Sequence, residues 1–238
     1  MPVALIALAV AVTTLLVRSE PGPAKGGRLT RFEAGGFSRV DGRSATPGAR
    51  LRVTREQAYE GSKAVKISYD GRPGNIFARA WFEVRWRRGS DVWYGAAFYV
   101  PDPTRLRYTD LIRWDNYETY GRRGDVGGLA VDEGNLTLFR KRYRDPGGSQ
   151  PLAAPVPVPP ARWFWVEVHQ RFSDVDRRAL TELYLDGQKV AESNAANMTG
   201  RRIDDVRYGY VYNWNEGGSS TIYMDRLSYS DRMRGPAP

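Results

Sequence analysis

The sequence predicts an all-β protein, a single two-sheet β-sandwich of the jelly-roll type. Runs of β-branched and aromatic residues, bounded by turn residues, recur from about residue 30 onward. Dipeptides typical of tight hairpins, such as Asp186-Gly187, separate neighbouring runs. No segment shows the sustained period of an amphipathic helix. About a dozen strands of this kind fit one sandwich domain.

The runs that carry the strand signal follow one another along the chain. They are residues 77–86, 92–100, 108–117, 127–139, 162–173, 206–214 and 220–230. The turn sequences "DEGN" and "LDGQ" each lie between two such runs and predict hairpins. The Pro-rich stretch 151–162 is predicted to be an extended surface loop.

The amino terminus predicts export. The apolar run 4–17 is shorter than the roughly 20 residues of a membrane span and suits the core of a secretory signal. We therefore divide the chain into 1–19, a signal peptide or uncleaved anchor, and 20–30, a linker rich in Pro and Gly. The jelly-roll domain follows at 31–232, and 233–238 form a tail. Either reading of the first segment places the protein outside the cytoplasm, secreted or anchored.

The strand 162–173, "RWFWVEVHQRFS", contains the only histidine of the chain. Side chains of a strand alternate between two faces, so one apolar set suits a core. This set is Phe164, Val166, Val168 and Phe172. The opposite set is Trp163, Trp165, Glu167, His169 and Arg171. Grouped outward indoles often mark a binding surface, so this second face is predicted to contact a partner.

The strand 77–86 repeats the same pattern. Its predicted core residues are Ala78, Ala80, Phe82, Val84 and Trp86. Its predicted outward residues are Arg79, Trp81, Glu83 and Arg85. If this strand and the histidine strand are neighbours in one sheet, the two rows form a single basic, aromatic surface. The alternative is that the charged residues only face solvent, as they usually do.

Composition narrows the function. The net charge of +9 favours an anionic partner, which could be nucleic acid, an acidic polysaccharide or a membrane surface. Without cysteine and with one histidine, disulfides, thiolate metal sites and a histidine zinc site are excluded. The sequence also has no G-x-S-x-G elbow, P-loop or dinucleotide fingerprint. No cofactor is expected.

The residues on the strands suit β-elimination on a uronic-acid polymer. That reaction needs a cation or amide to neutralise the sugar carboxylate, a base for the C5 proton and an acid for the leaving oxygen. The chain supplies these types in His169, Gln170, Arg113, Asn116, Tyr208, Tyr210 and Tyr212. Alternation puts His169 and Gln170 on opposite faces, which favours His169 with Arg171. At least two of the three tyrosines are expected to be core residues.

Several blocks together resemble polysaccharide lyases of the heparin-lyase type. They are "SDVWYGAAFYVP" (90–101), "DLIRWDN" (110–116), "WFWVEVHQRFS" (163–173), "ELYLDGQKV" (182–190) and "IYMDRLSYS" (222–230). The resemblance implies a concanavalin A-like jelly roll with a concave cleft, and elimination by a histidine and a tyrosine. It makes His169 the base, Tyr210 or Tyr212 the acid, and Arg113 with Asn116 the carboxylate or sulfate ligands. Arg79, Trp81, Trp165 and Arg171 complete the predicted substrate-binding set.

Two functions therefore stay open. The first is an exported lyase acting on an acidic polysaccharide, and the alternative is a lectin-like module that binds a glycan in a basic, Trp-lined groove. Nucleic acid is not expected as a partner, because no motif supports it. The membrane enters only through an uncleaved amino-terminal segment, and a monomer is expected. A structural calcium ion is a further alternative, with Asp186 and Asp225 as candidates on position only.

Overall fold

A computed structural model describes residues 27–72, 74–116, 124–141, 149–198, 200–215 and 218–237. Two antiparallel eight-stranded sheets, which we call sheet A and sheet B, pack face to face. Sheet A contains β1 (Arg28–Thr30), β3 (Ala49–Thr54), β4 (Ala64–Tyr69), β6 (Asp91–Tyr99), β12 (Trp163–Arg171), β13 (Leu180–Leu185), β14 (Gln188–Ser193) and β16 (Ser220–Ser230). Sheet B contains β2 (Gly42–Ala45), β5 (Gly74–Arg87), β7 (Thr109–Asn116), β8 (Gly124–Asp132), β9 (Asn135–Lys141), β10 (Ser149–Pro151), β11 (Val156–Pro157) and β15 (Arg202–Asn215).

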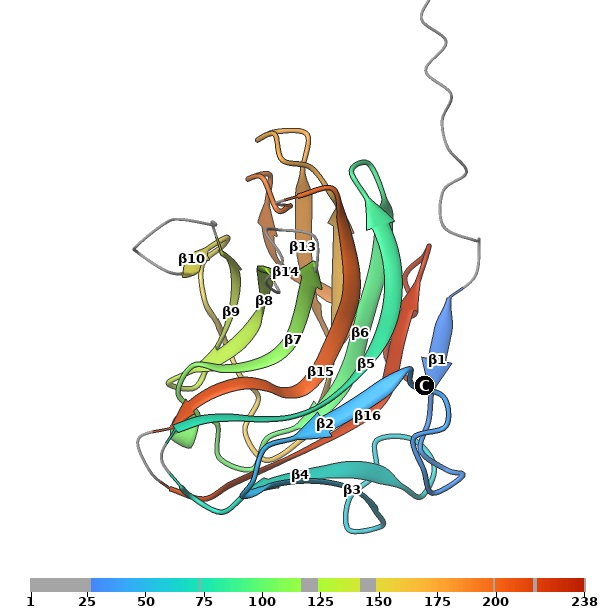
Figure 1. Cartoon of the computed structure of the whole chain (residues 1–238), viewed down its shortest axis with the longest axis vertical. Coiled ribbons are helices and arrows are strands. Elements are labelled where there is room, and N and C mark those ends of the chain that lie inside the picture. Colours follow the sequence, from blue (N-terminus) through green and yellow to red (C-terminus); the bar gives the residue numbers. More distant parts are fainter. Residues whose placement is uncertain are drawn as a thin grey trace, which may run out of the picture.

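This architecture confirms the predicted all-β, jelly-roll-like sandwich. The one helical element in the described residues is the short 3₁₀ helix η1 (Pro103–Arg105). Strands β5, β7 and β15 of sheet B are strongly bent, with β3, β4 and β16 of sheet A on the convex side of the bend (Figure 1). We call the outer face of sheet B the concave face. The predicted Asp186-Gly187 hairpin joins β13 to β14, and both turn residues have positive φ, as this turn requires.

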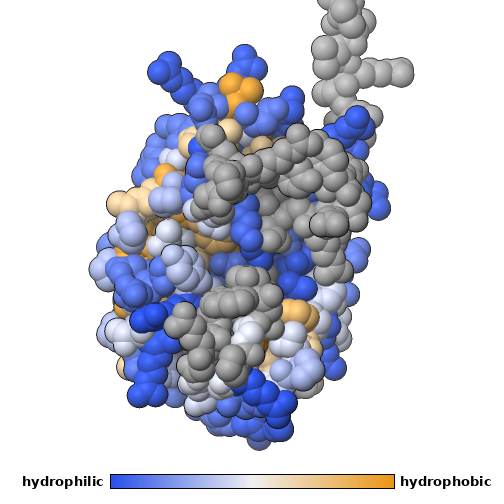
Figure 2. All heavy atoms as spheres, turned by 60° about the vertical axis from the view of Figure 1, so that its left-hand side comes forward, coloured by the Kyte–Doolittle hydropathy of each residue, from blue (hydrophilic) through white to orange (hydrophobic). Residues whose placement is uncertain are grey.

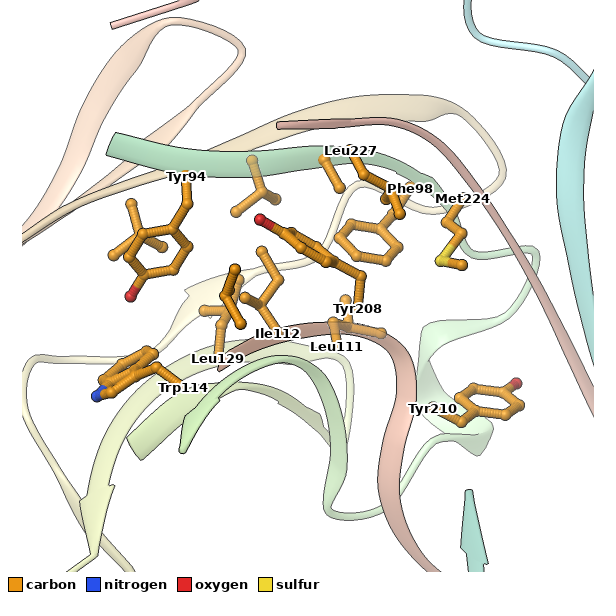
Figure 3. Packing of buried hydrophobic residues seen from close by; sticks show 14 of the residues in the cluster. Tyr94, Phe98, Leu111, Ile112, Trp114, Leu129, Tyr208, Tyr210, Met224 and Leu227 are labelled. Atoms are coloured by element: carbon orange, nitrogen blue, oxygen red, sulfur yellow. The ribbon is translucent and has the colours of Figure 1, made fainter. Parts of the chain in front are cut away.

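The core lies between the two sheets, as alternation predicts. All the residues expected inside from β5 and β12 are buried, including Phe82, Phe164 and Val166 at 0% exposure. Trp86 of β5 stacks against Tyr94 and Phe172, with ring centroids 5.5 and 5.8 Å apart, and so ties sheet B to sheet A. Figure 3 shows more of this packing, with Tyr208 among apolar side chains from both sheets. Burial of large aromatic rings on this scale is the main force that holds the sheets together.

The domain boundaries shift at both ends. The predicted linker 20–30 is too long, because β1 already pairs with β16 from Arg28 onward. The predicted tail is not loose: the backbone N–H groups of Arg234 and Gly235 donate to the carboxylate of Glu167 at 2.7 and 3.0 Å. The segment predicted to be a signal or anchor, 1–19, lies outside the described residues. Within the described part of the chain, no helix has the length and apolar character needed to cross a membrane.

The prediction of one joint surface from two strands is wrong. Strand β5 belongs to sheet B and β12 to sheet A. Each strand directs its apolar residues into the shared core, so their outward rows lie on opposite outer faces of the sandwich. The Trp81 row and the His169 row therefore cannot act on the same bound molecule.

Candidate functional site on the concave face

The concave face carries a row of side chains that crosses three strands in register. Trp81 of β5 is paired with Arg207 of β15, which in turn is paired with Arg113 of β7. The next row along the strands is Glu83, Asp205 and Asp115. Neighbouring strands lie about 5 Å apart, so these rows bring indole, guanidinium and carboxylate groups together on one surface. In the view of Figure 2, hydrophilic residues are visible in the middle of this side of the molecule, beside hydrophobic ones.

The arginines at the centre are held by carboxylates. Arg207 forms ion pairs with Asp115 and with Asp205, the latter at 2.8 Å between Nη2 and Oδ2. Arg113 Nη1 lies 3.3 Å from Asp110 Oδ2, and its Nε lies 4.0 Å from Asp115 Oδ1. All five residues are 5% exposed or less. Such a buried network fixes the guanidinium groups firmly, because losing one partner would leave a charge buried without compensation.

Part of the face along β5 is accessible. Arg79 and Trp81 are both partly exposed, as the alternation predicted. The Arg79 guanidinium lies 4.5 Å from the centre of the Phe77 ring, and its Nε donates to Ser44 Oγ at 3.4 Å. The predicted substrate ligands Arg79, Trp81 and Arg113 therefore share one face. Asn116, at the end of β7, is fully buried.

The predicted acid Tyr210 lies in the core, away from the concave face. Its hydroxyl donates to Ser220 Oγ at 3.0 Å, and Tyr208 donates to the backbone oxygen of Ser228 at 2.7 Å. Burial raises the pKa of both hydroxyls. Figure 3 shows both rings. This confirms that two of the three tyrosines are core residues, and it removes Tyr210 from the predicted catalytic set. The side chain of Tyr212 lies outside the described residues, so its role stays a prediction.

The predicted base His169 lies on the outer face of sheet A, not on the concave face. Its Nδ1 is 2.7 Å from Glu182 Oε2, and its Nε2 is 2.5 Å from Asp91 Oδ1. Its ring stacks on Trp93 with centroids 4.1 Å apart and planes 5° apart. Lys189 donates to Glu182 at 3.0 Å. Burial of Glu182 opposes ionisation, but the hydrogen bonds from His169 and Lys189 outweigh it and lower the pKa of this carboxyl.

Both ring nitrogens of His169 are thus within hydrogen-bond distance of carboxylates on the outer face of sheet A, and neither points toward the concave face. The sequence correctly placed His169 opposite Gln170, whose Oε1 accepts from the Tyr94 hydroxyl in the core at 2.6 Å. The structure does not bring His169 together with Arg113 or with Tyr210.

The two remaining predicted ligands, Trp165 and Arg171, also lie on the outer face of sheet A. Trp165 is fully buried: its Nε1 donates to Glu167 at 3.3 Å, and the Arg226 guanidinium lies 4.9 Å from its ring centre. Arg171 is exposed, and its Nε donates to the backbone oxygen of Arg178 at 3.2 Å. Neither can line a groove on the concave face.

The calcium candidates have protein partners. Asp186 accepts from the backbone N–H of Trp165 and from Arg162, both at 2.8 Å. Asp225 accepts from the backbone N–H groups of Tyr59 and Glu60 at 3.3 and 3.2 Å. Among the described residues, no group of three or more His, Cys, Asp or Glu side chains could hold a metal ion.

The sequence analysis missed the central residues of the charged network. It did not single out Arg207 or the three aspartates of the network, which are Asp110, Asp115 and Asp205. The signal was present for two of them, since Asp205 and Arg207 alternate with the buried Val206 and Tyr208. Applied to "DDVRYGY", the rule used for β5 would have placed both residues on an outer face.

The fold and this face define a class of protein: a bent jelly-roll sandwich whose concave sheet carries arginine, carboxylate and indole groups. A model of the family described as "Polysaccharide lyase" matches residues 32–228. The chain therefore belongs to the polysaccharide lyase family. No curated protein sequence is significantly similar to it.

Solved structures with the same fold include three of different kinds. The endo-β-1,4-glucuronan lyase from the fungus Trichoderma reesei matches with a TM-score of 0.72 and 15% identity, over 86% of this chain and 95% of that one. The cellulose-induced protein Cip1 matches with 0.62 and 16%, over 88% and 100%. The binding domain of botulinum neurotoxin serotype G matches with 0.52 and 12%, over 86% and 47%. At these identities the likeness shows a shared fold. The comparisons do not support the narrower heparin-lyase subtype.

Proposed function

We propose that this chain is a lyase that cleaves a uronic-acid polysaccharide by β-elimination on its concave face. The observation that carries the proposal is the row of Trp81, Arg207 and Arg113 across that face, in a chain that belongs to the polysaccharide lyase family. The likeness to a glucuronan lyase and the net charge of +9 support an acidic substrate. The heparin-lyase subtype stays a prediction from the sequence blocks. We also propose export, on the apolar run 4–17.

The reaction divides into three tasks. A guanidinium paired with the sugar carboxylate stabilises the negative charge that develops when the C5 proton leaves. A base takes that proton, the C4–O bond breaks as the C4–C5 double bond forms, and an acid returns a proton to the leaving oxygen. Among the arginines of this face, Arg79 lies partly exposed beside Trp81 in the sequence of outward residues, whereas Arg113 and Arg207 are buried among aspartates.

Of the residues predicted to transfer protons, Tyr212 on β15 is the one that still fits this face. Tyr208 and Tyr210 belong to the core, and the predicted base His169 lies on the other sheet. The backbone of Tyr212 is paired with Asp110 of β7, the strand that also contains Arg113. We propose that Tyr212 takes the C5 proton and passes it to the leaving oxygen.

The test compares two substitutions that each remove one hydroxyl. Wild type, Tyr212→Phe and Tyr210→Phe are incubated with polyglucuronate, alginate and heparin, and the ultraviolet absorbance of the unsaturated product is followed. We expect wild type and Tyr210→Phe to cleave at least one polymer, and Tyr212→Phe to lose at least about 100-fold in rate. Tyr210→Phe loses one buried hydrogen bond, worth about 1 kcal/mol of stability, and controls for the loss of a hydroxyl on this strand.

The alternative function is a lectin-like module without chemistry. It is favoured by the distance of His169 from the concave face and by the carboxylates that already neutralise Arg113 and Arg207. Binding to these polymers without any unsaturated product from wild type would establish this alternative and end the lyase proposal.

A further inference from the structure

We propose that Phe77, Arg79 and Trp81 of β5 form a sugar-binding strip along the edge of the concave face that borders β2. The strip would take consecutive residues of an acidic polysaccharide, with the sugar rings against the aromatic groups and a carboxylate on Arg79. This inference rests on the proposed function, because it names the substrate contacts of the same face. It adds Phe77 and Gly42 to the site and sets the direction of the bound chain along β5.

The three side chains share one face of one strand. They occupy alternate positions, while the intervening Ala78 and Ala80 are fully buried in the core. Alternate side chains on a strand are about 7 Å apart, so an extended ligand that lies along β5 meets them one after another. All three are partly exposed. By contrast, Arg113 and Arg207 in the neighbouring strands are only 2% and 3% exposed.

The indole of Trp81 packs over Gly42, which has no side chain. The two residues are paired across β2 and β5. A Cβ atom placed on Gly42 would lie 2.1 Å from Cζ2 and 2.4 Å from Cε2 of Trp81, so the six-membered ring lies directly over the glycine. A side chain at position 42 would force the indole away from the strand. The missing side chain therefore fixes where the ring lies on the surface of β2.

Arg79 lies between Phe77 and Trp81 in the strand order and is held by Phe77 and Ser44. Its guanidinium lies 4.5 Å from the ring centre of Phe77, and its Nε donates to Ser44 Oγ at 3.4 Å. Ser44 is also its cross-strand partner in β2. A planar guanidinium held in this way can bind a carboxylate through two parallel hydrogen bonds. A cation between two aromatic residues of one strand matches a polymer whose sugars carry carboxylates better than it matches a neutral glucan.

The experiment measures binding apart from cleavage. Retardation in native gels that contain polyglucuronate, with a neutral glucan as the comparison polymer, is measured for wild type, Phe77→Ala, Trp81→Ala and Gly42→Ala. The matched control is Trp163→Ala, a partly exposed tryptophan on the outer face of sheet A. Melting curves confirm that each variant is folded. KM and kcat are measured on the polymer that wild type cleaves.

We expect Trp81→Ala and Phe77→Ala to weaken binding to polyglucuronate at least about fivefold and to raise KM, with little change in kcat. Gly42→Ala should weaken binding in the same direction although it removes no side chain, because it moves the indole. Trp163→Ala should match wild type.

Wild-type cleavage with unchanged KM and binding in all three strip variants would overturn the strip and leave the lyase intact. Binding that is lost in the strip variants, without cleavage by wild type, would support the strip and overturn the lyase. If wild type neither binds nor cleaves, both proposals fall.

Discussion

Strands β5 and β12 carry nearly the same outward residues and use them differently. On β5, Trp81 is partly exposed and Glu83 is exposed, whereas on β12 both Trp165 and Glu167 are 0% exposed. Both strands direct their apolar residues into one core. The difference is that other parts of the chain cover the outer face of sheet A at β12. A row of indole and carboxylate groups on a strand therefore indicates a binding face only where nothing from the same chain occupies it.

The covering segments are fastened by buried carboxylates. Glu167 accepts from the successive backbone N–H groups of Arg234 and Gly235. Asp225 accepts from those of Tyr59 and Glu60 in the same manner. Charge-assisted hydrogen bonds of this kind are the strong ones, and here they hold irregular backbone against a sheet. On sheet B the aspartates instead hold arginines, so the concave face keeps its cations in fixed positions.

The largest expected effect tests that role of the aspartates. Arg207→Ala leaves Asp115 and Asp205 buried without this partner, and we expect a loss of about 3–5 kcal/mol in the free energy of unfolding, measured by urea denaturation. Arg85→Ala, an exposed arginine on the same face, should change it by less than about 0.5 kcal/mol. Equal, small losses in both variants would mean that the concave network does not carry stability.

The next largest effect is a pH dependence of stability that comes from Asp225 on the outer face of sheet A. Burial raises the pKa of Asp225 to about 6, above the unfolded value near 4. A carboxyl whose pKa is higher in the folded state than in the unfolded state stabilises the fold most at a pH below its unfolded-state pKa. This stabilisation is lost as the pH rises through the folded-state pKa. The stability of wild type relative to Asp225→Asn should therefore fall by about 3 kcal/mol between about pH 4 and pH 7.

The measurement is urea unfolding of wild type and Asp225→Asn at steps across that range. Taking the difference at each pH removes the contribution of groups that titrate alike in both proteins. Glu182, on the same sheet, has a lowered pKa and acts in the opposite sense, so its contribution is lost as the pH falls. A flat difference would show that Asp225 ionises in the fold as readily as in the unfolded chain.

Alternation predicted the inward residues well, because that rule needs only the local chain. Phe82 and Phe164 are core residues, and Arg79 and His169 point outward, all as expected. Alternation does not hold where a bulge breaks the period. The register of β7 shifts between Asp110 and Ile112, so Leu111 and Ile112 are both buried in the core, and the Asp110 carboxylate reaches Arg113.

The candidate site was less predictable, because membership of a sheet depends on pairing between distant segments. Nothing local in β12 shows that it pairs with β6 and β13, or that β5 pairs with β15 and β2. The resemblance to lyases predicted the family but joined His169 and Arg113 in one site. Their separation follows from topology. The burial of Trp165 follows from Tyr59 and Arg226, which are distant in the sequence and lie against its ring.

A smaller change in stability than these two gives the sharpest test of the two faces. His169→Ala removes hydrogen bonds to Asp91 and Glu182, but Lys189 still neutralises Glu182 and Asp91 is half exposed to water. We expect a loss of about 1–2 kcal/mol in the free energy of unfolding and product formation within about a factor of two of wild type. Because the chain has a single histidine, its imidazole signals in a proton NMR spectrum report this ring alone and show whether polyglucuronate reaches it. Unchanged signals at saturating polymer would agree with a site on sheet B. A loss of about 1,000-fold in rate, in a variant that melts like wild type, would move the catalytic site to the outer face of sheet A and reverse the assignment of the two faces.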